Sequence, residues 1–585
     1  MRHKEIRALL LKRFNIPKAR PITRTMNSFT MAEKAVFFFF TAVFVLSGIF
    51  LLWKVSAAFL VEVPVRGGTL AEGLVGNPRF INPVLALSEA DKNLTALVYS
   101  GLARLTPDGQ VANDLAESIA VSPDKRVYTA VLKENARFHD GTKVTADDVV
   151  FTVMKIADPV IKSPRRGNWD DVEVEKTDER TVKFTLKRPY APFIYNLTVG
   201  ILPKHIWHNV TNDEFSFSQF NTLPVGSGPF EVESVERNSG GIPDYYKLKP
   251  FGDSSDKKPY IKNLAFRFYP SEATLIEAYN NGEVSAMSGV SPENLEKLDK
   301  SGLQVVRSPL PRIFAVFWNQ TKSKVLSDLD VRRALDLAAP KEKISEEIFK
   351  GFATPIDGPI PAGIYDWSSR RKDGESDEER FERARQILAT AGWVLDLETG
   401  VLEKKNKSGN MSLSFSISTG DAPELKRVAE ELKSVWEKLG AKVDVLVYET
   451  GDLNQNVIRP RQFEGLLFGE VVGRDADVYP FWHSSQRNDP GLNIALYANT
   501  KADRYLSEAR SASDRTEAER DLKAFQEEIA ADLPAVFLYT PSFLYIVPKE
   551  LKSVTLGPLA APQDRFLGIR DWYMETDRVW KIFLN

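Results

Sequence analysis

A histidine surrounded by aspartates is the first group of residues in this sequence that could do chemistry. It lies in the stretch ARFHDGTKVTADDVVFT, residues 136–152, in which His139 is followed by Asp140, Asp147 and Asp148. Histidine acts as a general base when it is positioned beside a nucleophile that it can deprotonate. The stretch supplies no nearby nucleophile for His139 to activate, which argues against a reaction centre.

Ordinary turn and capping roles account for the same aspartates. Asp140 and Gly141 form a typical turn pair. Thr145 can cap a helix that begins near residue 146, with Asp147 and Asp148 in its first turn, where the helix dipole favours negative charge. We therefore interpret residues 136–152 as architecture.

The other histidines offer at most one metal site. His205 and His208 are three residues apart and could share a helix face, although residues 203–208, PKHIWH, also resemble an ordinary helix start. The sequence has no HExxH motif, no GxSxG elbow and no Walker phosphate loop. It also has no cysteine, which excludes thiolate metal sites, disulfides and cysteine nucleophiles. We expect neither an enzyme nor a cofactor, and an extracytoplasmic hydrolase is the rival hypothesis.

Charge divides the chain into a short basic segment and an acidic remainder. Residues 1–34 contain nine Lys and Arg against two Glu, a net charge of +7, while the whole 585-residue chain carries −2. The remainder is therefore −9, which argues against nucleic acid as a partner. A hydrophobic content of 43% and the length are typical of a globular protein with several folding units.

Directly after the basic segment comes an apolar run that could cross a membrane. Residues 35–53, AVFFFFTAVFVLSGIFLLW, are uncharged and approach the roughly 20 residues that a spanning helix needs. The positive flank predicts that residues 1–34 stay in the cytoplasm and that the chain after residue 54 lies outside it. A cleaved signal peptide, with a cleavage site at residues 55–57, is the alternative, but the apolar run exceeds the usual length of a signal core.

The pattern beyond residue 65 predicts alternating strands and helices. Residues 68–75, 127–132 and 181–186 read as strands, the last with alternating apolar and polar positions. Residues 380–391 and 422–439 have helical spacing and are each followed by a strand, at 412–418 and 441–448. This alternation favours mixed α/β layers.

Ten short motifs resemble, in order, those of the peptide/nickel-type solute-binding proteins of ABC importers, bacterial extracellular solute-binding protein family 5. They extend over roughly residues 65–545 and are the following: NP (82–83), YSGLARL (99–105), residues 122–152, ILPKH (201–205), PVGSGPF (224–230), NNGEV (280–284), FWNQ (317–320), DLDVRRALDLA (328–338), DADVYPFWHSSQ (475–486) and DLPAVFLY (532–539).

The resemblance implies an α/β, two-lobed periplasmic-binding-protein-like fold with an inserted subdomain, preceded here by one N-terminal transmembrane helix. Its plan implies these parts: a basic cytoplasmic segment, 1–34; an anchor, 35–54; lobe I, 65–81, 223–309 and 541–585; the inserted subdomain of lobe I, 82–222; lobe II, 310–540. Strands crossing near residues 309–317 and 535–539 would form a hinge, and the ligand would bind between the lobes.

The resemblance also implies where the ligand would be held. Asp475 could pair with a ligand ammonium group and Arg474 with a carboxylate. Trp318, Tyr479 and Trp482 could line pockets, with Asn319 and His483 in the same clusters. The alternative is that the aromatic residues are core residues and that Asp475 shapes a turn. Residues 471–473, VVG, replace the aspartate with which peptide-binding members often receive an α-amino group.

These inferences together predict the solute-binding component of an ABC importer. The expected ligand is a short peptide or a similar polar solute, and the expected partners are permease and ATPase subunits on other chains. We expect a monomer that lies outside the cytoplasm, is held in the cell membrane by a single span and has no nucleic-acid partner. A membrane-tethered solute sensor is the second hypothesis, although residues 1–34 contain no recognisable signalling domain.

Overall fold

The computed structural model describes residues 29–190, 192–252, 257–299, 301–362, 364–365, 375–406, 409–473, 476–512 and 515–583. Contacts divide the chain into two compact units, of which the first comprises Met1–Val65 and Thr576–Asn585 and the second comprises Arg66–Glu575.

In the described residues the first unit contains one long helix, a two-stranded sheet and the short helix η9, Lys581–Phe583. Helix α3, Met31–Phe59, begins with a capping box in which the Thr30 backbone N–H donates to Glu33 Oε2 at 2.8 Å. Strand β1, Leu60–Val65, follows at once and pairs with β23, Glu575–Trp580. Among the described helices, α3 alone is long and apolar enough to cross a membrane, over Met31–Ser56. The predicted apolar helix is therefore present.

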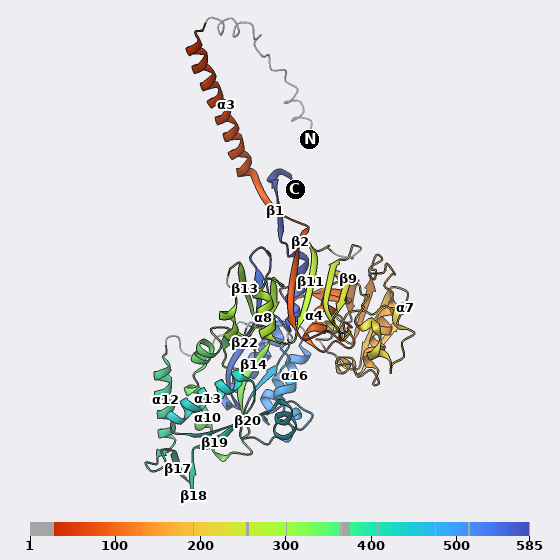
Figure 1. Cartoon of the computed structure of the whole chain (residues 1–585). Coiled ribbons are helices and arrows are strands. Elements are labelled where there is room, and N and C mark those ends of the chain that lie inside the picture. The colour runs from red at the N-terminus through yellow and green to blue at the C-terminus, as the bar shows by residue number, and fades with distance from the viewer. Residues whose placement is uncertain are drawn as a thin grey trace. The chain divides into compact units, whose positions relative to one another are not determined.

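The second unit is built on a mixed sheet of twelve strands (Figure 1). Ten of them follow one another in the order β20 (Lys442–Tyr448), β19 (Ser414–Gly420), β21 (Gly465–Val471), β14 (Arg312–Trp318), β22 (Ala535–Pro548), β12 (Ala286–Ser288), β2 (Gly67–Val75), β11 (Ile261–Tyr269), β10 (Pro243–Pro250) and β9 (Phe230–Arg237). Strands β13, Leu303–Pro309, and β15, Ala353–Pro355, pair additionally with β22.

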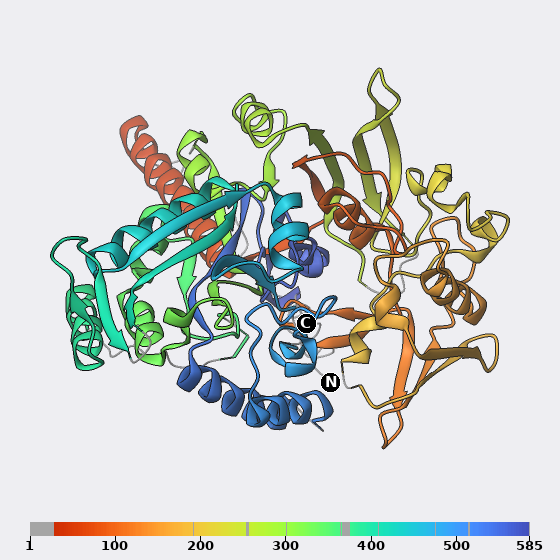
Figure 2. The ribbon, with the colours of Figure 1, turned by 90° about the horizontal axis from the view of Figure 1, so that it is seen from below.

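Strand β22 connects the two halves of this sheet. Its first part pairs antiparallel with β14, for example Ala535 with Phe317, and its second part pairs with β13, for example Val547 with Gln304. Its sequence is apolar almost throughout, as expected for a strand that is buried on both faces. In Figure 2 the green-to-cyan segments and the orange-to-yellow segments of this unit form two separate groups.

The hydrophobic cores follow the same division. One large core contains buried residues from 70–310 and 543–572, and two further cores contain residues from 313–539. The predicted inserted subdomain, 82–222, contributes to the first core, for example through Leu94 and Phe184. The lobe boundaries themselves stay predictions.

A four-stranded sheet lies within residues 82–222, with the order β5 (Ala116–Val121), β6 (Val127–Leu132), β8 (Thr181–Leu186) and β7 (Val172–Lys176). A separate pair joins β3 (Ala103–Leu105) to β4 (Val111–Asn113). The bounds predicted for β6 and β8 are those observed, because alternating burial on one face directly reflects the alternating sequence.

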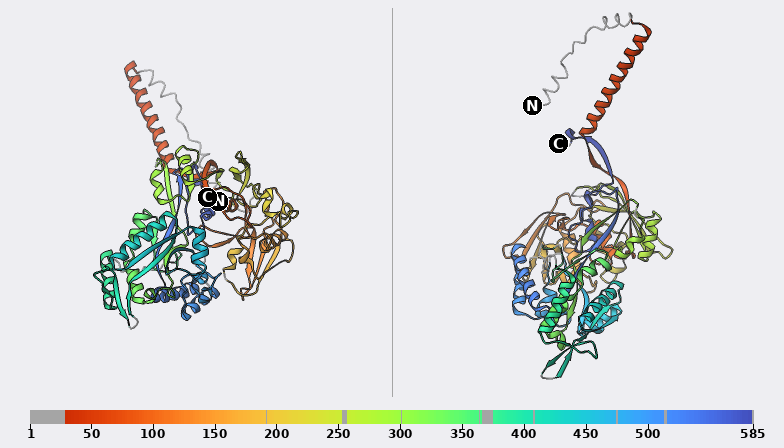
Figure 3. Two further views of the ribbon diagram at one scale, coloured as in Figure 1. Left: turned by 60° about the horizontal axis from the view of Figure 1, so that its bottom comes forward. Right: turned by 90° about the vertical axis from the view of Figure 1, so that its left-hand side faces the viewer.

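Helices cover the sheets and connect their strands. Within the described residues the α-helices of the second unit are α4 (Glu89–Val98), α5 (Ala146–Ala157), α6 (Phe193–Asn196), α7 (Lys204–Trp207), α8 (Glu272–Asn280), α9 (Lys324–Ser327), α10 (Leu329–Ala338), α11 (Lys341–Lys343), α12 (Asp377–Thr390), α13 (Pro423–Lys438), α14 (Thr450–Asp452), α15 (Tyr479–Trp482), α16 (Thr500–Ser511) and α17 (Arg515–Asp532). The short helices η1 (Arg166–Trp169), η5 (Ile344–Ile348) and η6 (Leu453–Ile458) lie between them, and η8 (Pro562–Asp571) follows β22. Helices α16 and α17 pack side by side (Figure 3).

One predicted strand is interrupted. The sequence predicted a continuous strand over residues 412–418, whereas the structure has β18, Gly409–Ser412, and then β19, Ser414–Gly420. Leu413 between them is fully buried, and its backbone N–H donates to the carbonyl of Leu402. The interruption lets β18 pair with β17, Leu402–Asn406, while β19 joins the large sheet.

Candidate ligand cavity

A large cavity lies in the second unit and is the best candidate for a ligand site. Its volume is about 890 Å³. Residues from 83–114, 165–200 and 560–570 line it, together with Pro229 and with Arg510 of α16. This volume is in the range of pockets that enclose small molecules. Among the described lining residues, Arg510 comes from the predicted lobe II, 310–540, and the others come from outside that range. Segments that are far apart in the sequence therefore line the same cavity.

A buried acid, Asp114, lies in the wall of the cavity, and two arginines of the same wall influence its charge. Asp114 is 5% exposed, and burial raises the pKa of its carboxyl group. The hydrogen bond from Ser100 and the charges of Arg570 and Arg104 act in the opposite direction. This part of the wall can offer both hydrogen-bond donors and an acid to a ligand.

Arg510 reaches the cavity in a fixed orientation. Its Nε lies 2.9 Å from both carboxylate oxygens of Asp477, and its Nη2 lies 2.5 Å from Asp477 Oδ2. The guanidinium carbon also lies 4.1 Å from the centroid of the Tyr479 ring. Bidentate pairing and stacking on an aromatic face both restrict the guanidinium plane. Tyr479 therefore acts on the cavity through Arg510, as the cavity lining includes Arg510 and not Tyr479.

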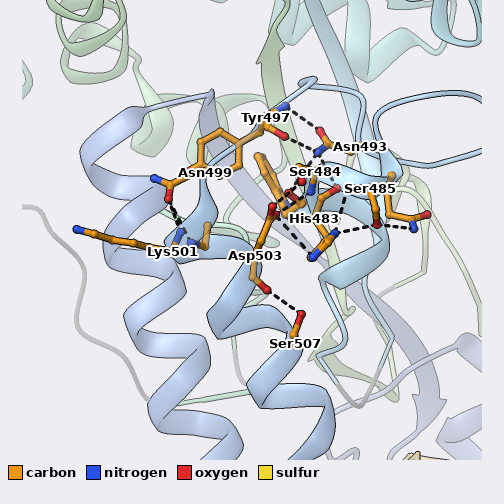
Figure 4. Close-up of polar contacts among 12 residues, drawn as sticks. His483, Ser484, Ser485, Asn493, Tyr497, Asn499, Lys501, Asp503 and Ser507 are labelled. Carbon is orange, nitrogen blue, oxygen red and sulfur yellow. Dashed lines mark hydrogen bonds and ion pairs between the residues drawn. The ribbon is translucent and has the colours of Figure 1, made fainter. Parts of the chain in front are cut away.

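A polar network ties α15 to α16, the helix that carries Arg510 (Figure 4). Ser484 donates its backbone N–H to Asp503 Oδ1 at 2.8 Å, and His483 Nδ1 lies 2.8 Å from Ser485 Oγ. Asn493 donates its side-chain amide to the carbonyls of His483 and Tyr497. The Tyr479 and His483 rings stack with 4.1 Å between their centroids. His483 thus stabilises the segment that orients Arg510.

The other predicted ligand residues are placed away from the cavity. Trp318 and Trp482 are both 0% exposed and lie in two different hydrophobic cores. Asn319 is also fully buried, where its amide donates to the Arg461 carbonyl at 3.0 Å. In this conformation none of the three lines the cavity, and their contact with a ligand stays a prediction. Arg474 and Asp475 lie outside the described residues.

The stretch that contains His139 is structural, as its sequence indicated. The Gly226 N–H donates to His139 Nδ1 at 3.3 Å, and His139 Nε2 lies 3.2 Å from the Gly228 carbonyl, so the ring holds this loop. Asp140 accepts from the Thr142 N–H, and Asp148 accepts from the Thr145 N–H at the start of α5. Burial lowers the pKa of His139 to about 4, which keeps the ring neutral at pH 7.

The two histidines considered for a metal have other contacts. His205 Nε2 lies 2.7 Å from Asp140 Oδ2, and His208 Nδ1 lies 3.1 Å from the Lys204 carbonyl. Within the described ranges, no three His, Asp or Glu side chains are grouped as metal ligands.

Sequence reasoning did not single out the charged residues that line the cavity. Arg104 lies in the motif YSGLARL but was not predicted as a ligand residue, and Asp114, Arg510 and Arg570 belong to none of the ten motifs. Arg510 lies on an amphipathic helix, where an arginine ordinarily indicates a solvated face. Tyr479 gave a further partial signal, because it was predicted as a ligand residue and contacts Arg510.

The chain is similar in sequence to a family of known proteins. A family model described as "Bacterial extracellular solute-binding proteins, family 5 Middle" matches residues 110–503. The chain is 28% identical over 524 residues to the oligopeptide-binding protein AppA of Bacillus subtilis (strain 168), covering 87% of this chain and 92% of AppA.

Solved structures agree with this match. The structure of Bacillus subtilis AppA in complex with a nonapeptide aligns with a TM-score of 0.65 at 27% identity, covering 88% of this chain and all of AppA. NikZ from Campylobacter jejuni in complex with Ni(L-His) aligns with a TM-score of 0.65 at 26% identity, covering 86% of this chain and 99% of NikZ.

Proposed function

The chain belongs to family 5 of the bacterial extracellular solute-binding proteins, with the two-lobed α/β fold of that family, and from this premise we propose that it captures a short peptide or a similar polar solute for an ABC importer. The proposed ligand site is the cavity of about 890 Å³, and this cavity is the observation that carries the proposal. A permease on another chain, working with ATPase subunits, would receive the solute, which this chain releases unchanged.

The composition of the cavity supports a hydrophilic ligand. A polar solute that leaves water needs hydrogen-bond partners in the protein, because an unpaired polar group costs free energy when it is buried. Asp114, Arg104, Arg510 and Arg570 supply such partners along the wall. Peptide backbones also carry donors and acceptors that a protein backbone can pair with, whatever the side chains.

The proposal is tested by ligand-dependent stability of the full-length protein in detergent. A peptide at about 100 times its Kd should stabilise the folded state by roughly 2.7 kcal/mol, which for a unit of this size raises Tm by about 2–3 °C. A pooled library of two- to nine-residue peptides is the probe. If no peptide or other polar solute shifts Tm, or if the peptides are recovered cleaved, the proposal is refuted.

Specific contacts are proposed for two residues beyond the described part of the chain. Asp475 would bind a ligand ammonium group and Arg474 a ligand carboxylate. Asp475→Ala should weaken peptides with a free amino terminus and leave N-acetylated peptides unaffected. Equal affinities of the variant and the wild type for free and acetylated peptides would remove this assignment.

We propose in addition that α3 holds the protein in the cell membrane with residues after 54 outside the cytoplasm. Residues 35–53 of the helix are uncharged, and their side chains are exposed. Strand β1 follows the helix directly and pairs with β23. Alkaline carbonate extraction and the intact mass test the proposal, because a retained anchor leaves an uncleaved protein in the membrane pellet.

Co-purification distinguishes delivery from sensing. A protein that feeds a transporter should be recovered with permease subunits after mild detergent extraction and crosslinking. Recovery with a kinase or chemotaxis protein in place of a permease would instead support the membrane-tethered sensor.

A further inference from the structure

The cavity wall carries more positive than negative side chains. Among its described lining residues seven are Lys or Arg and four are Asp. This excess contrasts with the chain after residue 34, which carries a net charge of −9. A concave wall of one sign concentrates the field and favours a ligand of the opposite sign. The excess of positive charge in the wall therefore favours solutes with a negative charge.

Three of the four acidic residues of the wall contribute little to that field. Asp171 is paired with Lys187. Asp564 accepts the backbone N–H of Ala560 at 2.7 Å and that of Ala561 at 3.2 Å, a capping arrangement at the start of η8. Asp114 is the buried acid, and burial favours its neutral form. These three negative charges are thus paired, engaged in backbone hydrogen bonds or partly suppressed, and Asp170 is the fourth acid of the wall, at an exposed position.

Three of the cations have no such compensation. Lys92 on α4, Arg165 before η1 and Arg188 after β8 all line the cavity. Throughout the residues that the structure describes, no ion pair joins any of the three to a carboxylate. Burial also lowers the pKa of Arg165, which is the effect of removing a guanidinium from water without a compensating anion. A charge placed in this way is stabilised when an anion arrives.

We propose that the cavity selects solutes with an acidic group, and that Lys92, Arg165 and Arg188 receive this group. The inference rests on the proposed function and names its ligand class: a peptide or similar solute with a carboxylate or phosphate in addition to any chain terminus. Arg is suited to this role because its planar fork matches a carboxylate or phosphate with two hydrogen bonds.

The test compares matched tripeptides by calorimetry on the full-length protein in detergent. Ala-Glu-Ala should bind about tenfold more tightly than the isosteric Ala-Gln-Ala, and Ala-Lys-Ala should bind more weakly than both, because a hydrogen bond between charged groups is stronger than a neutral one. Succinate and inorganic phosphate are tested alongside, which distinguishes an acidic peptide from a small acid or a phosphate as the preferred source of the anion.

A pair of neighbouring arginines provides a matched variant and control. Arg165→Gln should reduce the affinity for the acidic ligand about tenfold. Arg166→Gln removes the same charge from an exposed residue that does not line the cavity and should leave the affinity within about twofold. Unchanged Tm values show that both variants fold, and Arg188→Gln at an exposed wall position replaces Arg165→Gln if that variant does not.

Each result decides the inference separately from the proposed function. Equal binding of the three tripeptides refutes acidic selectivity and leaves peptide capture standing. Binding of succinate or phosphate alone, weakened by Arg165→Gln, supports the cationic site and removes the peptide ligand. Equal effects of Arg165→Gln and Arg166→Gln overturn the residue assignment, and no binding of any probe overturns both proposals.

Discussion

A fully buried ion pair connects the cavity wall to the large sheet, and removing its cation should measurably destabilise the protein. Arg565 on η8 and Glu72 on β2 both have side chains that are 0% exposed, with Arg565 Nη2 2.5 Å from Glu72 Oε1. Tyr545 on β22 donates its hydroxyl to Glu72 Oε2 at 2.9 Å. Arg565 Nη1 donates to Asn93 Oδ1 and to the Pro562 carbonyl, both at 2.8 Å. The Arg565–Glu72 pair therefore connects four segments, η8, β2, α4 and β22.

The expected magnitude follows from the burial of both charges. Arg565→Met keeps most of the side-chain volume but leaves the Glu72 carboxylate buried without a cation, which costs about 3–5 kcal/mol. Unfolding entropy is about 2.1 cal/mol/K per residue, so a cooperative unit of roughly 500 residues has about 1 kcal/mol/K. Tm should fall by about 3–5 °C. Because η8 lines the cavity, the same variant should also weaken ligand binding.

Calorimetry of the full-length protein at two scan rates measures this effect, and a double variant is its control. Glu72→Leu combined with Arg565→Met replaces the pair with apolar groups and should recover most of the lost Tm, since the cost comes from the unpaired charge. A Tm for Arg565→Met within 1 °C of the wild type, or no recovery in the double variant, would refute the reasoning.

Two further predictions concern the loop held by His139. The pKa of His139 is about 4 in the folded protein against 6.5 for free histidine. The neutral ring therefore contributes about 3 kcal/mol to the free energy of unfolding above pH 6.5, and this contribution is lost as the pH falls toward 4. Denaturant titrations from pH 7.5 to 4 should show this loss in the wild type and in His208→Gln, but not in His139→Gln; parallel curves for all three would contradict it. Gly226→Ala would place a Cβ 2.0 Å from the Val98 carbonyl oxygen and should cost at least about 2 kcal/mol, whereas Gly451→Ala, with no atom within 4 Å, should change stability by less than about 1 kcal/mol. Equal stabilities of these two alanine variants would show that the loop shifts freely.

Local elements were predictable because their causes are local. The alternation of Val182, Phe184 and Leu186 with polar residues fixed the face and bounds of β8. Thr145 and Asp148 set the start of α5 through contacts three residues apart. The uncharged run at 35–53 likewise predicted α3 from length and composition.

The glycines of the motif PVGSGPF are explained by a contact in the tertiary structure. A Cβ at Gly226 would lie 2.0 Å from the Val98 carbonyl oxygen, and one at Gly228 would lie 2.5 Å from that of Leu97. The glycines of the motif therefore allow its backbone to lie close to the backbone at the end of α4. The sequence identified the motif, but the reason for its glycines is a contact about 130 residues away along the chain.

The sequence by itself determined the membrane-spanning candidate, the α/β alternation, the structural role of the His139 stretch and the family, because periodicity, capping and ordered motifs are properties of neighbouring residues. Only the tertiary structure decided that Trp318 and Trp482 are buried in separate cores and that Lys92, Arg165, Arg188 and Arg510 line one cavity. An aromatic side chain suits a core and a ligand pocket equally well, and an isolated arginine suits any solvated helix. Which of these it becomes depends on the segments that fold against it from distant parts of the chain.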